Sequence, residues 1–292
     1  MIYRISQVSR IRYGASVSLA RFNLRLRPID WPGQQIADFA LALDPAPVSM
    51  VTHPGAYPVN VTRIVIDAPL LSLEIRSSFL ATVDDVHPAP ETGDPSIATV
   101  AAQALKHPDL RPTAPAHYLY PSPLAPVTPA IAAWAASMLP PDAPVLAAAL
   151  ALARTIQADF GYDAAATEAD TPVDRAFAIR RGVCQDFAHI LIVALRSVGL
   201  PAAYASGYLR TIPPPGQPRL AGVDAMHAWV MLWCGPARGW IGLDPTNGII
   251  AGPDHILIAI GRDYGDVSPV DGVFVGAAAQ RIDTSVDVMP LD

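Results

Sequence analysis

Polar and apolar residues alternate through most of the first eighty positions of the chain. Phe22, Leu24 and Leu26 fall on one side of an extended segment, and the arginine and asparagine residues between them fall on the other. The same alternation returns over residues 39–43, 59–66 and 70–75. Successive side chains of a β-strand point to opposite faces, so this period of two predicts strands that are buried on one face only. Several short strands separated by Pro, Gly and Asp indicate an antiparallel β-sandwich domain over residues 1–90.

The periodicity weakens over residues 91–127, which are rich in Pro, Ala, Asp and His. This composition is typical of a linker between two domains. A short apolar pattern at 96–105 predicts one helix within it.

Helical periodicity begins at Pro129. Residues 129–139 and 144–160 each carry proline near the start, where a helix does not need the missing N–H. A third helix is expected to start at Cys184, because apolar residues recur at three- and four-residue steps until Gly199 and Pro201 end it.

Strands are expected after this helix, at 202–209, 226–234 and 240–243, with a surface loop at 213–218. Residues 128–292, including further strands at the C-terminus, therefore form a second, α+β domain.

Composition and charge narrow the classes of function. The 292 residues are 51% hydrophobic and 16% charged, which is too apolar for a disordered chain and enough for one or two folded domains. The net charge of −6 and the absence of any dense run of Lys and Arg argue against a nucleic-acid partner.

No membrane or export signal is expected. The N-terminus lacks an apolar signal region, and prolines interrupt the alanine-rich stretch 125–153 before it reaches the roughly 18 residues that a membrane span requires. The two cysteines, Cys184 and Cys234, do not suggest a disulfide framework. We therefore expect a protein of the cytoplasm that does not associate with a membrane.

Three residues combine into a candidate catalytic group. Cys184 lies at a helix N-terminus, where free N–H groups and the helix dipole favour a thiolate. His227 opens one predicted strand and Asp244 closes the next, so antiparallel pairing would bring imidazole and carboxylate to the same edge. Taken alone, Cys184 could equally be a small buried apolar residue.

The chain resembles the bacterial transglutaminase-like, candidate cysteine peptidase family. The strongest motifs are Arg-Gly-Val-Cys-Gln-Asp-Phe-Ala at 181–188, Met-His-Ala-Trp at 226–229 and Gly-Trp-Ile-Gly-Leu-Asp-Pro-Thr-Asn-Gly at 239–248. Gly-Arg-Asp-Tyr at 261–264 and Asp-Val-Ser-Pro-Val-Asp-Gly at 266–272 are similar to the family's C-terminal signature, and Leu-Arg-Leu-Arg-Pro at 24–28 is similar to its N-terminal β domain. The resemblance covers nearly the whole chain.

The resemblance implies a papain-like α+β core with Cys184 as nucleophile, His227 as base and Asp244 as the residue that orients the base. The chain departs from the family at Ala203, where arginine is usual, and at residues 53–60, which replace a characteristic turn. These departures concern substrate or domain contacts and leave the three residues intact.

Four further side chains are candidates for supporting roles. The backbone N–H of Cys184 is a natural donor to an oxyanion, and Gln185 and Tyr162 are candidates for a second donor. Asp186 could line the cleft or pair with His189 on a metal, although two ligands alone make a weak metal signal. Trp229 could cover His227. We expect no metal and no cofactor.

The resulting hypothesis is a thiol-dependent hydrolase of amide or peptide bonds in peptides or proteins. Two alternatives remain open: an acyltransferase that uses an amine acceptor, as transglutaminases do, and a noncatalytic module that binds peptides. No feature of the sequence indicates the oligomeric state or the role of the β domain.

Overall fold

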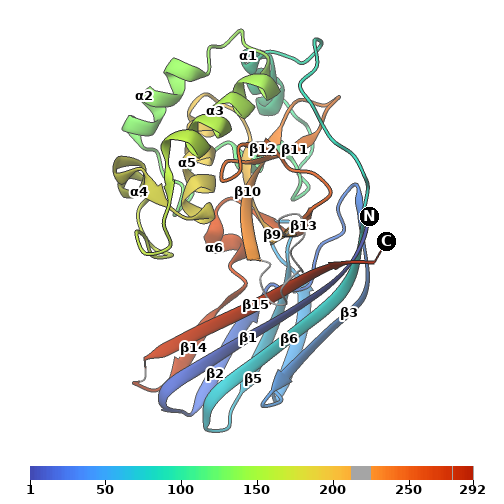
Figure 1. The fold of residues 1–292 in the computed structure, drawn as a ribbon, viewed down its shortest axis with the longest axis vertical. Coiled ribbons are helices and arrows are strands. Elements are labelled where there is room, and N and C mark those ends of the chain that lie inside the picture. The colour runs from blue at the N-terminus through green and yellow to red at the C-terminus, as the bar shows by residue number, and fades with distance from the viewer. Residues whose placement is uncertain (212–224, 278, 292) are drawn as a thin grey trace, which may run out of the picture.

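The computed structural model describes residues 1–211, 225–277 and 279–291, and it has two parts. Figure 1 shows a β-sandwich below and a mixed helical and β part above, with the two ends of the chain side by side. The α+β class and the antiparallel β-sandwich expected from the sequence are both confirmed. The loop expected at 213–218 lies outside the described residues.

The sandwich consists of two four-stranded antiparallel sheets. The first, in the order β15-β1-β6-β3, contains β1 (Ile2–Val17), β3 (Gln34–Asp44), β6 (Leu70–Val83) and β15 (Gln280–Pro290). The second, in the order β14-β2-β5-β4, contains β2 (Leu19–Leu24), β4 (Ser49–Pro54), β5 (Asn60–Ile66) and β14 (Val270–Val275). Burial alternates residue by residue along β1 and β6, as the period of two requires.

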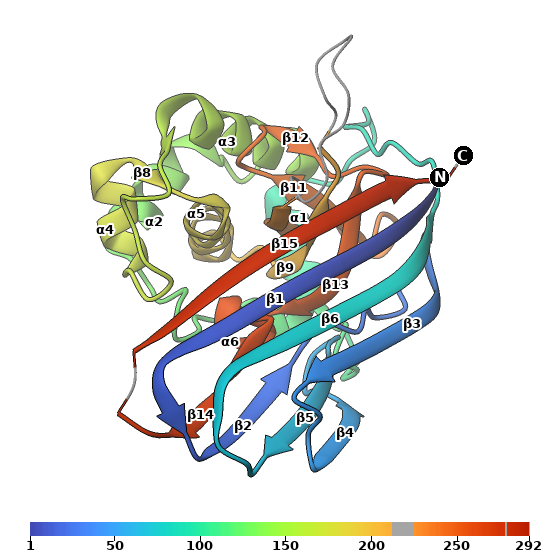
Figure 2. The same cartoon turned by 60° about the horizontal axis from the view of Figure 1, so that its bottom comes forward.

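The C-terminal strands belong to the sandwich and not to the second domain, to which the sequence assigned them. β15 pairs with β1 from Tyr3 opposite Pro290 to Tyr13 opposite Gln280, and β14 pairs with β2. Without them β1 and β2 would be open edges, with unpaired N–H and C=O groups along their whole length. Figure 2 shows β15 lying along β1. The sandwich therefore needs both ends of the chain.

The second part is built around a five-stranded antiparallel sheet in the order β12-β11-β10-β9-β13. Its strands are β9 (Ala202–Leu209), β10 (Ala225–Trp233), β11 (Trp240–Asp244), β12 (Ile249–Ile250) and β13 (His255–Gly261). The helices are α1 (Ile97–Leu105), α2 (Pro129–Met138), α3 (Val145–Asp159), α4 (Val173–Ile179), α5 (Cys184–Ser197) and α6 (Tyr264–Val267), with a short 3-10 helix η1 (Pro115–Tyr118) and a small parallel pair β7 (Gly161–Tyr162) and β8 (Arg181–Gly182).

Helix α5 is the central helix of this part. It packs against β9, β10, α2 and α4 and is buried along almost its whole length. On β10, Ala228, Val230 and Leu232 share its apolar core, whereas Trp229 and Met231 face a separate cluster on the other side of the sheet. The sequence predicted this helix and strands 9 to 11 to within one residue at each end, but it did not identify α4 or β13.

The two parts share one apolar core. Tyr3, Phe79 and Val288 of the sandwich lie in the same cluster as Tyr208 and Ile256 of the second sheet. The segment expected to be a linker also contributes, because α1 buries one face in this cluster. A joint core of this kind fixes the relative position of the two parts.

Close packing at Gly207 predicts a large effect of a single methyl group. Gly207 lies opposite His227 in the β9–β10 register, and a Cβ there would sit 2.1 Å from the backbone oxygen of Ile256 and 2.6 Å from the Trp229 ring. We expect Gly207→Ala to lower the free energy of unfolding by about 1–3 kcal/mol. Gly93→Ala is the matched control, because a Cβ there meets nothing within 4 Å. Equal denaturation midpoints for the two variants would contradict this packing.

Candidate active site

Cys184 is the first residue of α5, and the first turn of this helix is held by a buried carboxylate. Asp186 accepts hydrogen bonds from the backbone N–H of Val183, at 2.8 Å, and from the hydroxyl of Thr167, at 2.7 Å. A Cβ at Gly182 would lie 2.5 Å from the same carboxylate, so only glycine fits there. These contacts fix the direction in which the helix starts, and with it the position of the Cys184 thiol.

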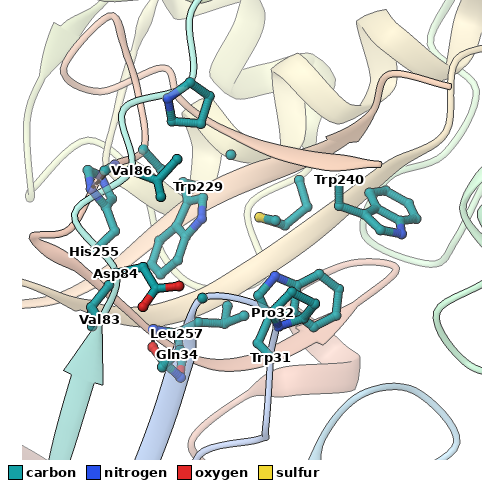
Figure 3. Close-up of a pocket in the computed structure, with 16 residues that line it drawn as sticks. Trp31, Pro32, Gln34, Val83, Asp84, Val86, Trp229, Trp240, His255 and Leu257 are labelled. Carbon is teal, nitrogen blue, oxygen red and sulfur yellow. Dashed lines mark hydrogen bonds between the residues drawn. The ribbon is translucent and has the colours of Figure 1, made fainter. Parts of the chain in front are cut away.

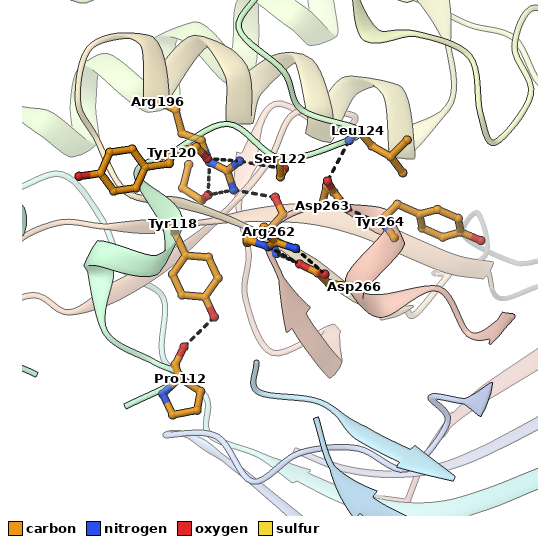
Figure 4. Close-up of polar contacts among 12 residues, drawn as sticks. Pro112, Tyr118, Tyr120, Ser122, Leu124, Arg196, Arg262, Asp263, Tyr264 and Asp266 are labelled. Carbon is orange, nitrogen blue, oxygen red and sulfur yellow. Dashed lines mark hydrogen bonds and ion pairs between the residues drawn. The ribbon is translucent and has the colours of Figure 1, made fainter. Parts of the chain in front are cut away.

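The far end of α5 is fixed by Arg196, which Figure 4 shows at the centre of a set of polar contacts. Its guanidinium donates to the backbone oxygens of Ala202, Arg262 and Tyr120 and to the hydroxyl of Ser122. Burial lowers the pKa of Arg196 to about 10, which still leaves it charged at neutral pH. The helix is thus held at both ends relative to β9 and β13.

His227 lies between Cys184 and Asp244. Its Nε2–H donates to Asp244 Oδ2 at 2.8 Å, and the ring is 8% exposed. Burial lowers the pKa of His227, but hydrogen bonds to Asp244 and to the Cys184 side chain outweigh this and raise it to about 9. The structure therefore brings together the three residues that the sequence singled out, and it favours a charged imidazole at neutral pH.

Asp244 is fully buried and accepts five hydrogen bonds. Oδ1 accepts from the backbone N–H groups of Thr246 and Asn247, at 2.9 and 3.1 Å. Oδ2 accepts from the Asn247 amide at 2.7 Å, from His227 and from His255. Burial raises the pKa of Asp244, but the hydrogen bonds from the two imidazoles outweigh it and hold the pKa far below its usual range. The carboxylate is ionised and anchors both rings.

His255, at the start of β13, is the residue of this site that the sequence analysis missed. Its Nε2 lies 3.1 Å from Asp244 Oδ2, and its Nδ1 accepts the backbone N–H of Gly252 at 3.3 Å. An imidazole that accepts at Nδ1 carries its proton on Nε2, so His255 serves as a second donor to the carboxylate. Its place at the start of an apolar strand, like that of His227, is the signal that could have identified it.

A metal could in principle be held by the same group. Among the described residues, His227, Asp244 and His255 form a set whose ligand atoms lie within 4.8 Å of one another. Each of the two Nε2 atoms already donates its proton to Asp244 Oδ2, so a cation could enter only by displacing these protons. The arrangement is satisfied by hydrogen bonds alone.

Asp186 and His189, the pair that the sequence suggested as metal ligands, each bond to a different part of the backbone. Asp186 serves the first turn of α5, whereas His189 Nε2 accepts the backbone N–H of Tyr264 at 3.2 Å. Burial lowers the pKa of His189 to about 4, so this ring is neutral. Asp186 thus holds the backbone before α5, and His189 holds the backbone at the start of α6.

The remaining candidates lie around the three central residues. Trp229 is 2% exposed and stacks beside His227, with ring centroids 6.3 Å apart. The side-chain amide of Gln185 donates to the backbone oxygen of Ala169, which ties the loop before α4 to α5. Tyr162 is 61% exposed. The part of its ring that is buried raises its pKa, and the nearby Cys184 raises it further. Gln185 thus holds a loop, while Tyr162 remains open to a ligand.

The opposite pKa shifts of two buried histidines give a test of this geometry. In a titration followed by NMR, His227 should keep its proton to about pH 9, whereas His189 should gain one only near pH 4. In the unfolded chain the pKa of His227 is near 6.5, so protonated His227 contributes its full stabilisation of the folded protein below about pH 6.5. This contribution to the free energy of unfolding is lost as the pH rises through about 9.

The control for this titration is Asp244→Asn, which removes the charge that holds the proton. In that variant His227 should titrate at a lower pH, while His189 should be unchanged. A wild-type His227 that titrates near 6.5 would contradict the arrangement.

Each of the two parts of the chain matches a known protein family. Residues 132–245 match the transglutaminase-like superfamily, and residues 3–82 match the bacterial transglutaminase-like N-terminal region. The first match contains Cys184, His227 and Asp244.

Proteins of mycobacteria are among the relatives that match along the whole chain. An uncharacterized protein of Mycobacterium tuberculosis strain H37Rv is 35% identical over 295 residues, which cover 99% of this chain and 90% of that protein. A protein-glutamine gamma-glutamyltransferase of Pseudomonas aeruginosa is 38% identical over 82 residues, only 28% of this chain and 12% of that protein.

Among solved structures, a candidate cysteine protease from Cytophaga hutchinsonii has the same fold. It superimposes with a TM-score of 0.74 at 19% identity and covers 100% of this chain and 92% of that chain. Among the described residues, no helix is both long and apolar enough to cross a membrane. The chain belongs to the transglutaminase-like superfamily and carries the bacterial transglutaminase-like N-terminal region.

Proposed function

We propose that the protein is a thiol-dependent hydrolase that cleaves amide or peptide bonds in peptides or proteins. The observation that carries this proposal is the buried His227 ring, which bonds to Asp244 at 2.8 Å and whose pKa is raised by that carboxylate and by the nearby Cys184 side chain. This is the arrangement used in acyl transfer: a nucleophile, then a base, then a group that orients the base.

We assign each reaction step to one of these residues. The Cys184 thiolate attacks the amide carbonyl, and the imidazolium of His227 gives its proton to the leaving amine, so that a thioester remains on the enzyme. Neutral His227 then takes a proton from water, which attacks the thioester and releases the acid together with the thiolate. Asp244 stays ionised throughout and stabilises the imidazolium.

The charge that develops on the carbonyl oxygen is stabilised at the start of α5. The backbone N–H of Cys184 is one donor, since the first N–H groups of a helix have no partner within the helix. Tyr162 is the better candidate for a second donor, because the Gln185 amide is already bonded to Ala169.

Water is the acceptor that we favour for the thioester. A crosslinking enzyme benefits from a dedicated amine site that excludes water, and none of the motifs in the sequence marks such a site. Transfer to an amine remains the competing reaction, and the Pseudomonas aeruginosa relative that is named as a glutamyltransferase makes it a necessary part of the test.

The two cysteines provide a first test of the nucleophile. Cys184 is partly exposed beside His227, whereas Cys234 is 1% exposed and burial raises its pKa to about 12. At pH 7 iodoacetamide should therefore modify Cys184 in the folded protein and leave Cys234 largely unmodified, as measured by peptide mass mapping. Equal and slow labelling of both thiols would favour a purely structural Cys184.

Product analysis separates hydrolysis from transfer. A peptide or amide substrate should give free acid even in the presence of a primary amine, and Cys184→Ala should abolish turnover. Asp244→Asn should lower kcat by about 10⁴-fold, as the loss of a triad carboxylate does elsewhere. Thermal unfolding of each variant controls for loss of structure.

Two outcomes would replace the proposal. Predominant amine incorporation at millimolar amine, with little acid, would make the protein an acyltransferase. Peptide binding by both the wild type and Cys184→Ala, with no turnover by either, would make it a binding module.

A further inference from the structure

A pocket of about 350 Å³ lies between the two parts of the molecule, on the side of the sheet opposite α5. Figure 3 shows its two walls. One wall comes from the sandwich, where Trp31 and Asp84 lie near the start of β3 and the end of β6. The other comes from the second sheet, with Trp229, Trp240 and His255. Its volume is at the lower end of the range for ligand sites and suits a small molecule.

Direct contacts between the two walls preform the pocket. The Gln34 side chain donates to the backbone oxygen of Leu257 and accepts its N–H, both at 2.8 Å, and Gln34 is 6% exposed. The backbone N–H of Asp84 donates to the oxygen of Gly33 at 2.8 Å, which joins the two sandwich segments. The lining therefore does not depend on a ligand to be assembled.

The lining is suited to a cation. Three of the five tryptophans of the chain line the pocket, and the face of an indole ring attracts organic cations. Among the described residues that line the pocket, Asp84 is the only one with a carboxylate, and none is Lys or Arg. None of the side-chain hydrogen bonds or ion pairs of the described residues uses the Asp84 carboxylate, whereas the neighbouring Asp85 is 3.0 Å from His87 Nε2.

The pocket is separate from the reactive thiol and yet connected to it. Neither Cys184 nor His227 lines it, so a molecule held there is not positioned to attack a thioester. His255 lines it and bonds to Asp244, which bonds to His227. A ligand in the pocket would therefore lie against the back of the catalytic group, at the second imidazole of Asp244.

We propose that this pocket binds a small organic cation of the ammonium type, held against the partly exposed rings of Trp31 and Trp240 beside the buried Trp229 and paired with Asp84. The site goes beyond the proposed hydrolase activity, and its occupancy can be measured without any substrate.

Choline is a suitable probe, and the indole N–H signals of the five tryptophans report where it binds. In ¹H–¹⁵N spectra at constant ionic strength, choline should shift the signals of the three pocket tryptophans along one saturable curve. Trp134 packs against Phe160 and Phe177, away from the pocket, and its signal should not move. The neutral isostere 3,3-dimethylbutan-1-ol should cause little shift, because it lacks the charge.

Matched variants test the role of the carboxylate. Asp84 is exposed, so Asp84→Asn should weaken choline binding by up to about fivefold, as expected for loss of an exposed ion pair. Asp85→Asn, which alters the adjacent carboxylate outside the pocket, should leave the affinity unchanged. Absence of a saturable shift, equal shifts with the neutral isostere, or equal effects of the two variants would overturn the proposal.

Discussion

The buried carboxylate of Asp244 is the group on which the geometry of the site depends. Its two oxygens accept five hydrogen bonds, which come from the turn after β11, from β10 and from β13. A buried charge with so many donors is stable only while all of them stay in place, since loss of a partner from a buried ion pair costs about 3–5 kcal/mol. One side chain therefore fixes the orientation of His227 and His255 and the path of the backbone that joins their strands.

The Cys184 thiol lies beside His227 because α5 is anchored independently of Asp244. Asp186 fixes the first turn through Val183 and Thr167. Arg196 fixes the other end through the backbone oxygens of Ala202 in β9 and of Arg262, the residue after β13. The apolar face of the helix fills the space between these anchors. The nucleophile and the base thus come from two rigid elements, which is the arrangement that holds reacting groups in place most precisely.

Local sequence patterns were sufficient to predict most of the elements that carry the site. The helix that starts at Cys184 and the strands that carry His227 and Asp244 follow from periods of 3.6 and 2, and antiparallel pairing of neighbouring strands is enough to bring the last two together. The place of His255 at the start of an apolar strand marks it as a candidate, but its contact with Asp244 could not be predicted in this way. Strand β13 lies beyond β9 in the sheet, and only the return of the chain after β12 brings this residue to Asp244. Long-range pairing also places residues 270–290 in the sandwich, because they pair with strands more than 240 positions earlier in the chain.

The central claim is that Cys184 forms a covalent acyl-enzyme with the help of the buried imidazole. Intact-mass measurement after brief exposure to an activated peptide ester or amide tests it most directly. We expect one acyl group per chain, located on Cys184 by peptide mapping and absent in Cys184→Ala. A wild-type protein that stays unmodified, or an adduct of the same size on the Cys184→Ala protein, would contradict it.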